Sequence, residues 1–145
     1  MFRVQLTTED DLEAALTNLE EALRKGESVT EKFLGEFRAS VNRGDSEVLV
    51  VYERGEAIGV AIVAYRLNVA AGSRFASVEE LHVSLAARRR GVGRALLEMI
   101  GRRCRARGVS YVEVQAVDQT AQAFYESVGY EISEGVRVMS CSYAL

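Results

Sequence analysis

The run Arg88–Arg94 (RRRGVGR) has the residue types and spacing of an anion-binding turn. An apolar, strand-like stretch leads into it and a helical pattern leads out of it. Gly91 and Gly93 therefore fall in the first turn of a helix, where unpaired N–H groups and the helix dipole favour phosphate. Glycine has no Cβ, so a ligand can approach the backbone closely. The spacing matches neither the dinucleotide fingerprint nor the Walker A motif, and it predicts a phosphate site of another kind.

Side chains that suit proton transfer come just before this turn: Glu79, Glu80 and His82. If residues 78–84 form a strand, alternation puts Glu80 and His82 on one face and Glu79 on the other. A carboxylate on such a face can accept a proton from an amine, directly or through a histidine or a water. His82 is the only histidine of the chain. A half-buried strand residue without a chemical role is its other interpretation.

The spacing of apolar residues predicts the elements that must position these side chains. Three- and four-residue spacing indicates helices at about 8–25, 28–44, 91–107 and 119–128. Alternating and β-branched runs indicate strands at 2–6, 48–52, 57–67, 78–84, 111–116, 130–133 and 136–143. We expect a loop or a poorly regular strand end over Asn68–Ser77, and a capping box that starts the second helix at Ser28. The order βααβββαβαββ describes an α/β (α+β) mixed sheet flanked by helices, with at least one parallel crossover.

Length and composition set the class of protein. The 145 residues amount to one domain, residues 1–145, long enough to fold without a disulfide or a metal. No apolar run is long enough to span a membrane, and the start lacks the apolar region of a signal peptide, so we expect a cytoplasmic protein. Cys104 and Cys141 are too few for a disulfide framework, and both are expected to pack in the core.

The net charge of −3 is the sum of two opposed parts. Residues 1–80 carry 9 basic and 15 acidic side chains, whereas residues 81–145 carry 9 basic and 6 acidic ones. Eight arginines lie within residues 88–107, against Glu98 alone. A basic stretch that is confined to these residues of an acidic chain argues against general nucleic-acid binding and favours one defined anionic ligand. A solvated, arginine-rich helix face is the alternative interpretation.

Two motifs make the chain similar to a known family. The run Arg88-Arg89-Arg90-Gly91-Val92-Gly93 fits the acyl-CoA signature R/Q-x-x-G-x-G/A, and Asp118–Tyr130 (DQTAQAFYESVGY) fits the pattern N-x-x-A-x-x-L/F-Y-x-x-x-G-F/Y. On these residues the chain resembles the GCN5-related N-acetyltransferase (GNAT) family from about Val48 to Tyr130. It departs from the family where Asp118 replaces the usual Asn. Asp still caps a helix, but it lacks the amide donor.

The resemblance implies an acetyl-CoA site. Backbone N–H groups around Arg89–Arg94 would hold the CoA pyrophosphate, and the strand Leu81–Val83 would pair with the pantetheine and polarise the acetyl carbonyl. Arginine side chains would add charge-assisted hydrogen bonds to the phosphates. The residues implied in binding are Leu81, His82, Val83, Arg88, Arg89, Arg90, Gly91, Val92, Gly93, Arg94, Ala95, Asp118, Ala121 and Phe124.

The resemblance also implies the groups that move protons. Tyr125 occupies the position of the general acid, and a phenol of pKa about 10 is a suitable donor to a thiolate of pKa about 8.5. The candidate bases are Glu80, then Glu79, then Glu113, and a chain of waters is the alternative to all three. A core tyrosine with a satisfied hydroxyl is the other interpretation of Tyr125. Cys104 and Cys141 lack a neighbouring base that would indicate an acyl-cysteine intermediate.

We therefore expect an N-acetyltransferase that moves the acetyl group of acetyl-CoA directly to a primary amine in a ternary complex, without a metal. The acceptor is a small amine, an aminoglycoside-like molecule or an amino acid. A protein N-terminal acetyltransferase of the ribosomal-protein type is an alternative, as is a non-catalytic acyl-CoA sensor. A toxin-type enzyme acting on aminoacyl-tRNA is disfavoured by the acidic first part of the chain. The family also implies a possible homodimer, and no nucleic-acid or membrane partner is expected.

Overall fold

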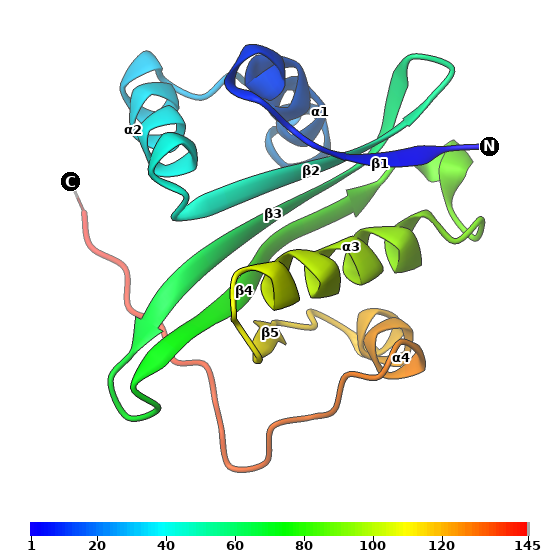
Figure 1. Cartoon of the computed structure of the whole chain (residues 1–145). Coiled ribbons are helices and arrows are strands. Elements are labelled where there is room, and N and C mark those ends of the chain that lie inside the picture. The colour runs from blue at the N-terminus through cyan, green and yellow to red at the C-terminus, as the bar shows by residue number, and fades with distance from the viewer. Residues whose placement is uncertain (145) are drawn as a thin grey trace. The chain divides into compact units, whose positions relative to one another are not determined.

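The chain folds as a mixed sheet with helices on both faces, as the sequence predicts. The computed structural model describes residues 1–144, without the side chain of Glu9. It divides into two compact units, Met1–Gln115 and the residues from Ala116 onward. In the first unit the described residues form a five-stranded sheet in the order β1-β2-β3-β4-β5, and the second unit contains α4 (Figure 1).

The elements follow the sequence prediction closely up to α4. The strands are β1 (Arg3–Leu6), β2 (Ser46–Glu53), β3 (Glu56–Asn68), β4 (Ser73–Val83) and β5 (Val112–Val114). The helices are α1 (Leu12–Arg24), α2 (Glu31–Arg43), α3 (Val92–Ala106) and α4 (Gln119–Ser127), with short 3₁₀ turns η1 (Glu9–Asp11) and η2 (Leu85–Ala87).

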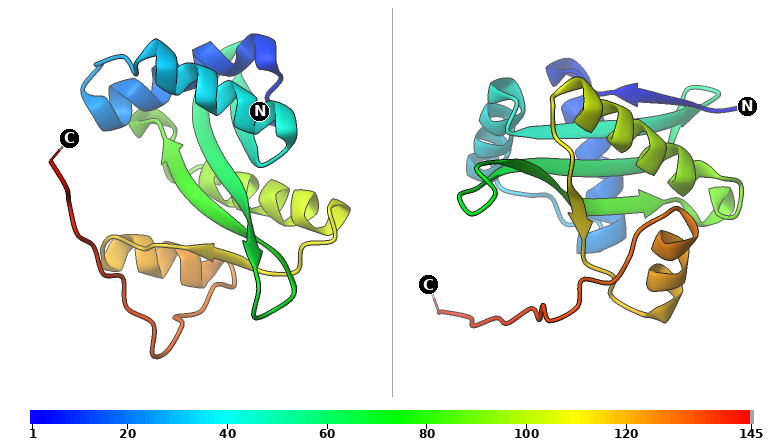
Figure 2. Two further views of the ribbon diagram at one scale, coloured as in Figure 1. Left: turned by 90° about the vertical axis from the view of Figure 1, so that its left-hand side faces the viewer. Right: turned by 60° about the horizontal axis from the view of Figure 1, so that its bottom comes forward.

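Both faces of the sheet are covered in the first unit (Figures 1 and 2). Helices α1 and α2 pack on one face, where a cluster of buried residues joins α1 to β2 and β3: Leu12, Ala15, Leu16, Leu19, Val48, Val50, Val60 and Ile62. Burial of each such leucine stabilises the fold by about 2 kcal/mol. Helix α3 packs on the opposite face. A Cβ at Gly59 of β3 would lie 2.8 Å from Val92 Cγ1, so glycine there lets the start of α3 approach the sheet.

Strand β4 is longer than the sequence predicts. It begins at Ser73 rather than Val78, so residues 73–77, expected as a loop or a poorly regular strand end, are strand, and the turn between β3 and β4 is shorter. Pairing with β3 decides between the two alternatives here. Ala76 lies opposite Tyr65 in that pairing and is fully buried, although the local composition is small and weakly apolar.

A β-bulge interrupts β4. Ile62 lies opposite Glu80, whereas the next residue, Val63, lies opposite Val78. Glu79 is therefore the extra residue, which locally breaks the alternation of faces. The sequence prediction that Glu79 points away from the face of Glu80 assumed a regular strand, and the bulge removes that assumption.

Beyond the bulge, β4 has an open edge. The parallel pairing with β5 covers only Ala76, Ser77 and Val78. The segment Glu79–Val83 continues along β3 on one side, and no strand among residues 1–144 pairs with its other side. The crossover from β4 through α3 to β5 is the parallel connection that the sequence predicts.

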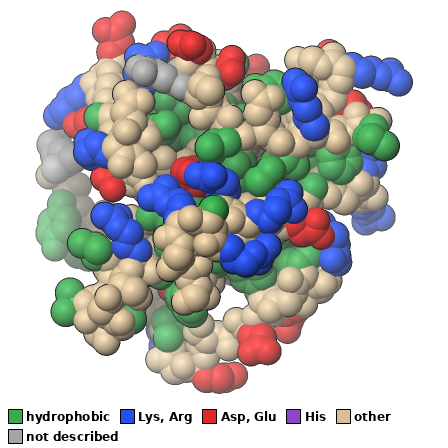
Figure 3. Space-filling view, in the orientation of Figure 1, with side chains coloured by type: hydrophobic (Ala, Val, Ile, Leu, Met, Phe, Trp, Pro, Cys, Tyr) green, Lys and Arg blue, Asp and Glu red, His purple; other side chains and the backbone are tan. Residues whose placement is uncertain are grey.

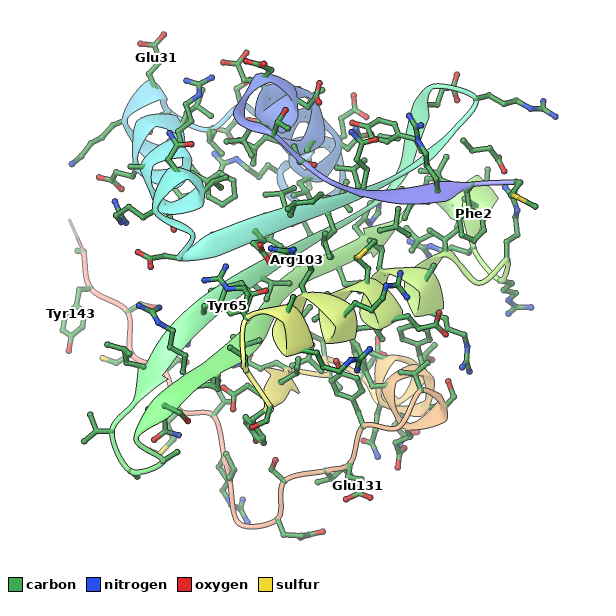
Figure 4. All side chains as sticks on the ribbon, in the orientation of Figure 1. Phe2, Glu31, Tyr65, Arg103, Glu131 and Tyr143 are labelled. Atoms are coloured by element: carbon green, nitrogen blue, oxygen red, sulfur yellow. The ribbon has the colours of Figure 1, made fainter. Side chains whose placement is uncertain are left out.

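A buried ionic cluster fixes the last turns of α3 to the sheet. Glu47 of β2 is only 7% exposed, and it accepts hydrogen bonds from the Tyr65 hydroxyl at 2.6 Å and from Arg103 Nη2 at 2.5 Å. Figure 4 shows Tyr65 and Arg103 pointing toward one another. Arg107 lies 3.5 Å from Glu47 and stacks 3.7 Å over the Tyr65 ring. Burial raises the pKa of Glu47, but the hydrogen bonds from Arg103 and Tyr65 outweigh it and leave the pKa lowered.

Helix caps largely follow the predicted chemistry. The Thr30 hydroxyl accepts the Phe33 N–H at 3.1 Å and caps α2. The expected capping box at Ser28 was wrong, because the helix starts two residues later and Thr30 provides the oxygen. Asp118 caps α4 as predicted, since its carboxylate accepts the Ala121 N–H at 2.8 Å.

The two strands predicted after α4 do not form in the described residues, which are irregular from Tyr130 to residue 144. Alternation shows only that a segment could bury one face. A strand also needs a neighbour that pairs with its backbone. Val138 and Met139 are 70% and 91% exposed, so the apolar face of this segment is not buried. Cys141 is exposed for the same reason, against expectation, whereas Cys104 is buried in α3 as predicted.

Candidate functional site

The basic turn between β4 and α3 has the geometry of an anion cradle. The chain passes from β4 through η2 and turns at Arg89 and Gly91, which both have positive φ values of 63° and 84°. Gly91 is the N-cap of α3, and a Cβ placed on it would meet nothing within 4 Å. The space beside this glycine is open to a ligand.

The amides of the first turn of α3 face that space. The first hydrogen bond of the helix runs from the Ala95 N–H to the Gly91 carbonyl at 3.0 Å. The N–H groups of Val92 and Gly93 precede it, so the helix itself offers them no acceptor. They add to the positive end of a 15-residue helix, which favours an anionic ligand.

Several arginines of residues 88–107 bind acidic side chains of the sheet. Figure 3 shows basic side chains gathered on the face that carries α3. Arg90 binds the carboxylate of Glu53 with both terminal nitrogens, and the Nη1–Oε1 distance is 3.0 Å. Arg103 and Arg107 bind Glu47. The local positive charge read from the sequence is therefore partly neutralised by acidic residues of β2.

The backbone of β4 presents hydrogen-bonding groups at its open edge. The Ser84 N–H donates to the Ile58 carbonyl of β3 at 2.9 Å. Because backbone groups alternate in direction along a strand, those of Leu81 and Val83 point away from β3, toward the open edge. Arg88 Nε reaches the Val83 carbonyl at 3.1 Å, which agrees with that direction. This edge leads directly into the basic turn.

A pair of titratable side chains lies on the face that carries α1 and α2. Glu80 lies opposite Ile62 and His82 opposite Val60, and residues opposite each other in an antiparallel pair share a face. The prediction that Glu80 and His82 share a face is confirmed. Burial raises the pKa of Glu80, and the nearby charge of Glu79 raises it further. Burial and then Arg88 lower the pKa of His82, so the imidazole is neutral at pH 7.

Glu79 has a partner of its own. Its carboxylate binds the Arg66 guanidinium of β3. The side chain is thus held in an ion pair on the sheet, which suits a charged structural role better than proton transfer. Glu113 lies on β5 opposite Ser77 and is exposed.

The remaining predicted site residues lie in the second unit. Asp118 and Ala121 form the cap of α4, so the Asp118 carboxylate already has a backbone donor. The ring of Tyr125 lies 5.2 Å from that of Phe124 and 5.6 Å from that of Tyr130. Burial raises the pKa of the Tyr125 phenol. A hydroxyl in this environment keeps its proton at neutral pH.

Comparison with protein families decides the class of protein. The model of the acetyltransferase (GNAT) family matches residues 12–130. The chain belongs to this family. It is therefore an acetyl-CoA-dependent N-acetyltransferase. A comparison with curated proteins gave no match.

Solved structures of GNAT enzymes share the fold. An aminoglycoside acetyltransferase from an uncultured soil metagenomic sample is 23% identical with a TM-score of 0.82, covering 99% of this chain and 96% of that chain. The aminoglycoside 6′-N-acetyltransferase of Acinetobacter baumannii is 18% identical with a TM-score of 0.78, covering 99% of this chain and 100% of that chain. Glucosamine-6-phosphate N-acetyltransferase of Arabidopsis thaliana is 21% identical with a TM-score of 0.80, covering 99% of each chain. At these identities the likeness establishes the fold.

The residues present in this GNAT chain fit acetyl-CoA. The open space at Gly91, the amides at the start of α3 and the unpaired edge at Leu81 and Val83 supply donors for phosphates and for an extended amide arm. Within residues 1–144, no group of three His, Cys, Asp or Glu side chains is placed to hold a metal ion. No helix in that range is both long and apolar enough to cross a membrane.

Two residues that contact the site were missed by sequence reasoning. Glu53 binds Arg90 across 37 positions of sequence, and no local pattern signals that contact. Arg66 binds Glu79 across the β3–β4 hairpin. The register between the two strands brings this pair together, and alternation within either strand alone does not show that register.

Proposed function

We propose that this enzyme transfers the acetyl group of acetyl-CoA directly to a primary amine of a small cationic acceptor, in a ternary complex. The observation that carries the proposal is the open edge of β4, from whose end the chain passes through η2 to the glycine turn and the start of α3. An extended molecule with a phosphate-bearing end fits such a surface along its whole length.

In this proposal the two parts of the surface hold different parts of acetyl-CoA. The amides of the α3 start bind the pyrophosphate, and Arg89 and Arg94 flank that start in the sequence. The backbone groups of Leu81 and Val83 pair with the pantetheine arm. A main-chain N–H at this edge also polarises the thioester carbonyl, which stabilises the oxyanion formed on attack.

Transfer requires a neutral amine and a proton for the departing thiolate. Glu80 takes a proton from the amine, directly or through water or His82, and its raised pKa makes it a better base than an ordinary carboxylate. The neutral amine nitrogen attacks the thioester carbon, the C–S bond breaks, and Tyr125 gives its phenolic proton to the thiolate. The proton that the nitrogen loses as the amide forms then returns, through water, to the Tyr125 phenolate. Glu79, bound to Arg66, contributes negative charge beside Glu80.

The acceptor class is inferred from charge and from the named relatives. Glu79 and Glu80 present carboxylates on the face of β4 that carries α1 and α2, in a part of the chain with excess acidic residues. Two of the structures that share the fold are described as aminoglycoside acetyltransferases, and a third acts on glucosamine-6-phosphate. An amine-bearing sugar is therefore the first acceptor class to test.

The test is release of free CoA thiol from acetyl-CoA in the presence of aminoglycosides, hexosamine phosphates, polyamines, amino acids and N-terminal peptides. We expect turnover with at least one amine-bearing sugar and a product heavier by one acetyl group. Turnover with peptides alone would replace this acceptor by a protein N-terminus. Tight binding of CoA without thiol release from any amine would instead indicate an acyl-CoA sensor.

A further inference from the structure

We infer that Glu53 is a positioning residue for the acetyl-CoA turn, acting through Arg90. This inference rests on the proposed function of the turn and adds a residue of β2 to it. Glu53 lies at the end of β2, beside the β2–β3 hairpin, and Arg90 lies in the middle of the turn that precedes α3. The pair therefore joins two segments that are remote in sequence.

The geometry of this contact is specific. Arg90 Nη1 lies 3.0 Å from Glu53 Oε1, and Arg90 Nη2 binds Oε2 of the same carboxylate. Two parallel hydrogen bonds between a planar guanidinium and a carboxylate fix direction as well as distance. The contact lowers the pKa of Glu53 and raises the pKa of Arg90, so both groups stay charged over the physiological range.

The turn needs such a restraint. Arg89 has a φ of 63°, in the left-handed region that side chains other than glycine and asparagine rarely adopt. Gly91 follows with a φ of 84° and has the greatest backbone freedom of any residue. Arg90 stands between them. Holding its guanidinium on β2 favours the turn conformation in which the amides at the start of α3 converge on the open space.

The contact also separates two roles for Arg90. In one role its guanidinium binds phosphate, and in the other it orients the backbone from its place on Glu53. A side chain that already makes a forked pair with a carboxylate would have to leave it to reach a phosphate. The structure assigns the second role, in which only the backbone of Arg90 belongs to the phosphate cradle.

The two roles predict opposite effects of one substitution. If Glu53 restrains the turn, Glu53→Gln lowers the population of the binding-competent conformation. The Kd for CoA and the KM for acetyl-CoA then rise by the same factor, about two- to fivefold. The kcat and the KM for the acceptor stay unchanged. If Arg90 instead binds phosphate, Glu53→Gln frees it, and the affinity for CoA stays the same or increases.

The experiment combines calorimetric titration of CoA with thiol-release kinetics on the full chain. It compares the wild type with Glu53→Gln, Arg90→Gln, the double variant, and Glu56→Gln as a matched change in the same hairpin. We expect equal weakening in both single variants and no further loss in the double variant, because both remove the same contact. Glu56→Gln should bind CoA as the wild type does.

Two results would overturn the inference. One is unchanged or tighter CoA binding by Glu53→Gln, and the other is a much larger loss in Arg90→Gln than in Glu53→Gln. Gly93→Val, which blocks the start of α3 itself, keeps the proposed function separately testable. If the wild type binds CoA and Gly93→Val does not, the cradle stands whatever the Glu53 variants show. If the wild type fails to bind CoA, both the function and the positioning role are wrong.

Discussion

The hydroxyl of Tyr125 is the atom on which the proposed acid step depends. Burial raises its pKa, so it remains protonated at neutral and mildly alkaline pH, where a CoA thiolate still needs a proton. The substitution Tyr125→Phe keeps the ring and its packing against Phe124 and removes only the proton. We expect kcat to fall at least tenfold in thiol-release assays, with the Kd for CoA nearly unchanged.

A matched control is available on the same unit. Tyr143 is 82% exposed, so Tyr143→Phe makes the same chemical change at a surface position and should leave kcat unaltered. Full activity in Tyr125→Phe would remove the general-acid role and return Tyr125 to a packing residue.

As the proposed base, Glu80 should determine the acidic limb of the pH profile. A base must be ionised to act, so kcat/KM falls as the pH drops through its pKa. Burial and the charge of Glu79 raise that pKa, so the acidic limb lies at a higher pH than an ordinary carboxyl group would give. We expect Glu80→Gln to lower kcat at least tenfold and to abolish this limb.

A raised pKa also means that ionised Glu80 costs folding free energy at neutral pH, so Glu80→Gln should not lower Tm there.

The ion pair between Arg66 and Glu79 tests the electrostatic part of this argument. Removing the guanidinium leaves the charge of Glu79 uncompensated beside Glu80, which raises the pKa of Glu80 further. In Arg66→Gln we therefore expect the acidic limb to move to higher pH. Arg74→Gln is the control, because Arg74 binds the Tyr65 carbonyl at 3.3 Å and lies 3.7 Å from Asp45. Equal profiles for both variants would show that Glu79 has no influence on the base.

At the scale of elements, the sequence predicts those features that local residue patterns determine. The start of α3, its glycines and the Asp118 cap follow from residue types and spacing, and the structure agrees. The features that the sequence could not predict depend on contacts between elements. The bulge at Glu79 arises from the register between two strands, and the failure of the C-terminal strands arises from the lack of a paired neighbour. Neither is encoded in the alternation of either segment alone.

The site shows the same division. The glycine turn and the helix that follows it are local features and were predicted, whereas the partners of the charged residues there were not. Of the arginines in the basic stretch, Arg90 and Arg103 bind carboxylates of β2 that stand far from them in sequence. A count of charges could not reveal which guanidinium groups are already occupied.

The first turn of α3 offers a test that separates binding from stability. Gly93 lies within the helix at a position without positive φ, where valine has a higher helix propensity than glycine. Gly93→Val should therefore keep Tm. The family signature accepts only glycine or alanine at this position, so the bulkier isopropyl group should crowd the proposed phosphate cradle, and we expect CoA affinity to fall at least tenfold by calorimetric titration.

The control for this substitution lies in the same helix. Gly101 is also within α3, and a Cβ there meets only Arg105 Nη1 at 3.5 Å, an ordinary contact. Gly101→Val should keep Tm without a change in CoA binding. If Gly93→Val binds CoA as tightly as Gly101→Val does, the start of α3 does not hold the phosphates.

At the scale of the whole molecule, the net charge of −3 is the sum of two oppositely charged parts of the chain. The excess of acidic residues before Leu81 and of basic residues after it supplies carboxylates to β2 and β4 and arginines to the turn and α3. Part of each set neutralises the other through Glu47 and Glu53. What is left positive surrounds the start of α3, and what is left negative includes the face of Glu80. In the proposed function, a basic cosubstrate site and an acidic acceptor face are thus built from one nearly balanced chain.

This arrangement predicts how ligands stabilise the fold. A ligand present at 100 times its Kd stabilises the folded chain by about 2.7 kcal/mol, which for a protein of this size raises Tm by roughly 5–10 °C. We expect that increase with CoA in thermal unfolding at low salt, and a smaller one at high salt, because screening weakens the attraction of the turn for phosphates. Pantetheine has the arm that would pair with β4 but lacks the pyrophosphate, so at the same concentration it should give little or no shift. An equal shift with pantetheine would place the binding free energy on the edge of β4 and not on the arginine-glycine turn.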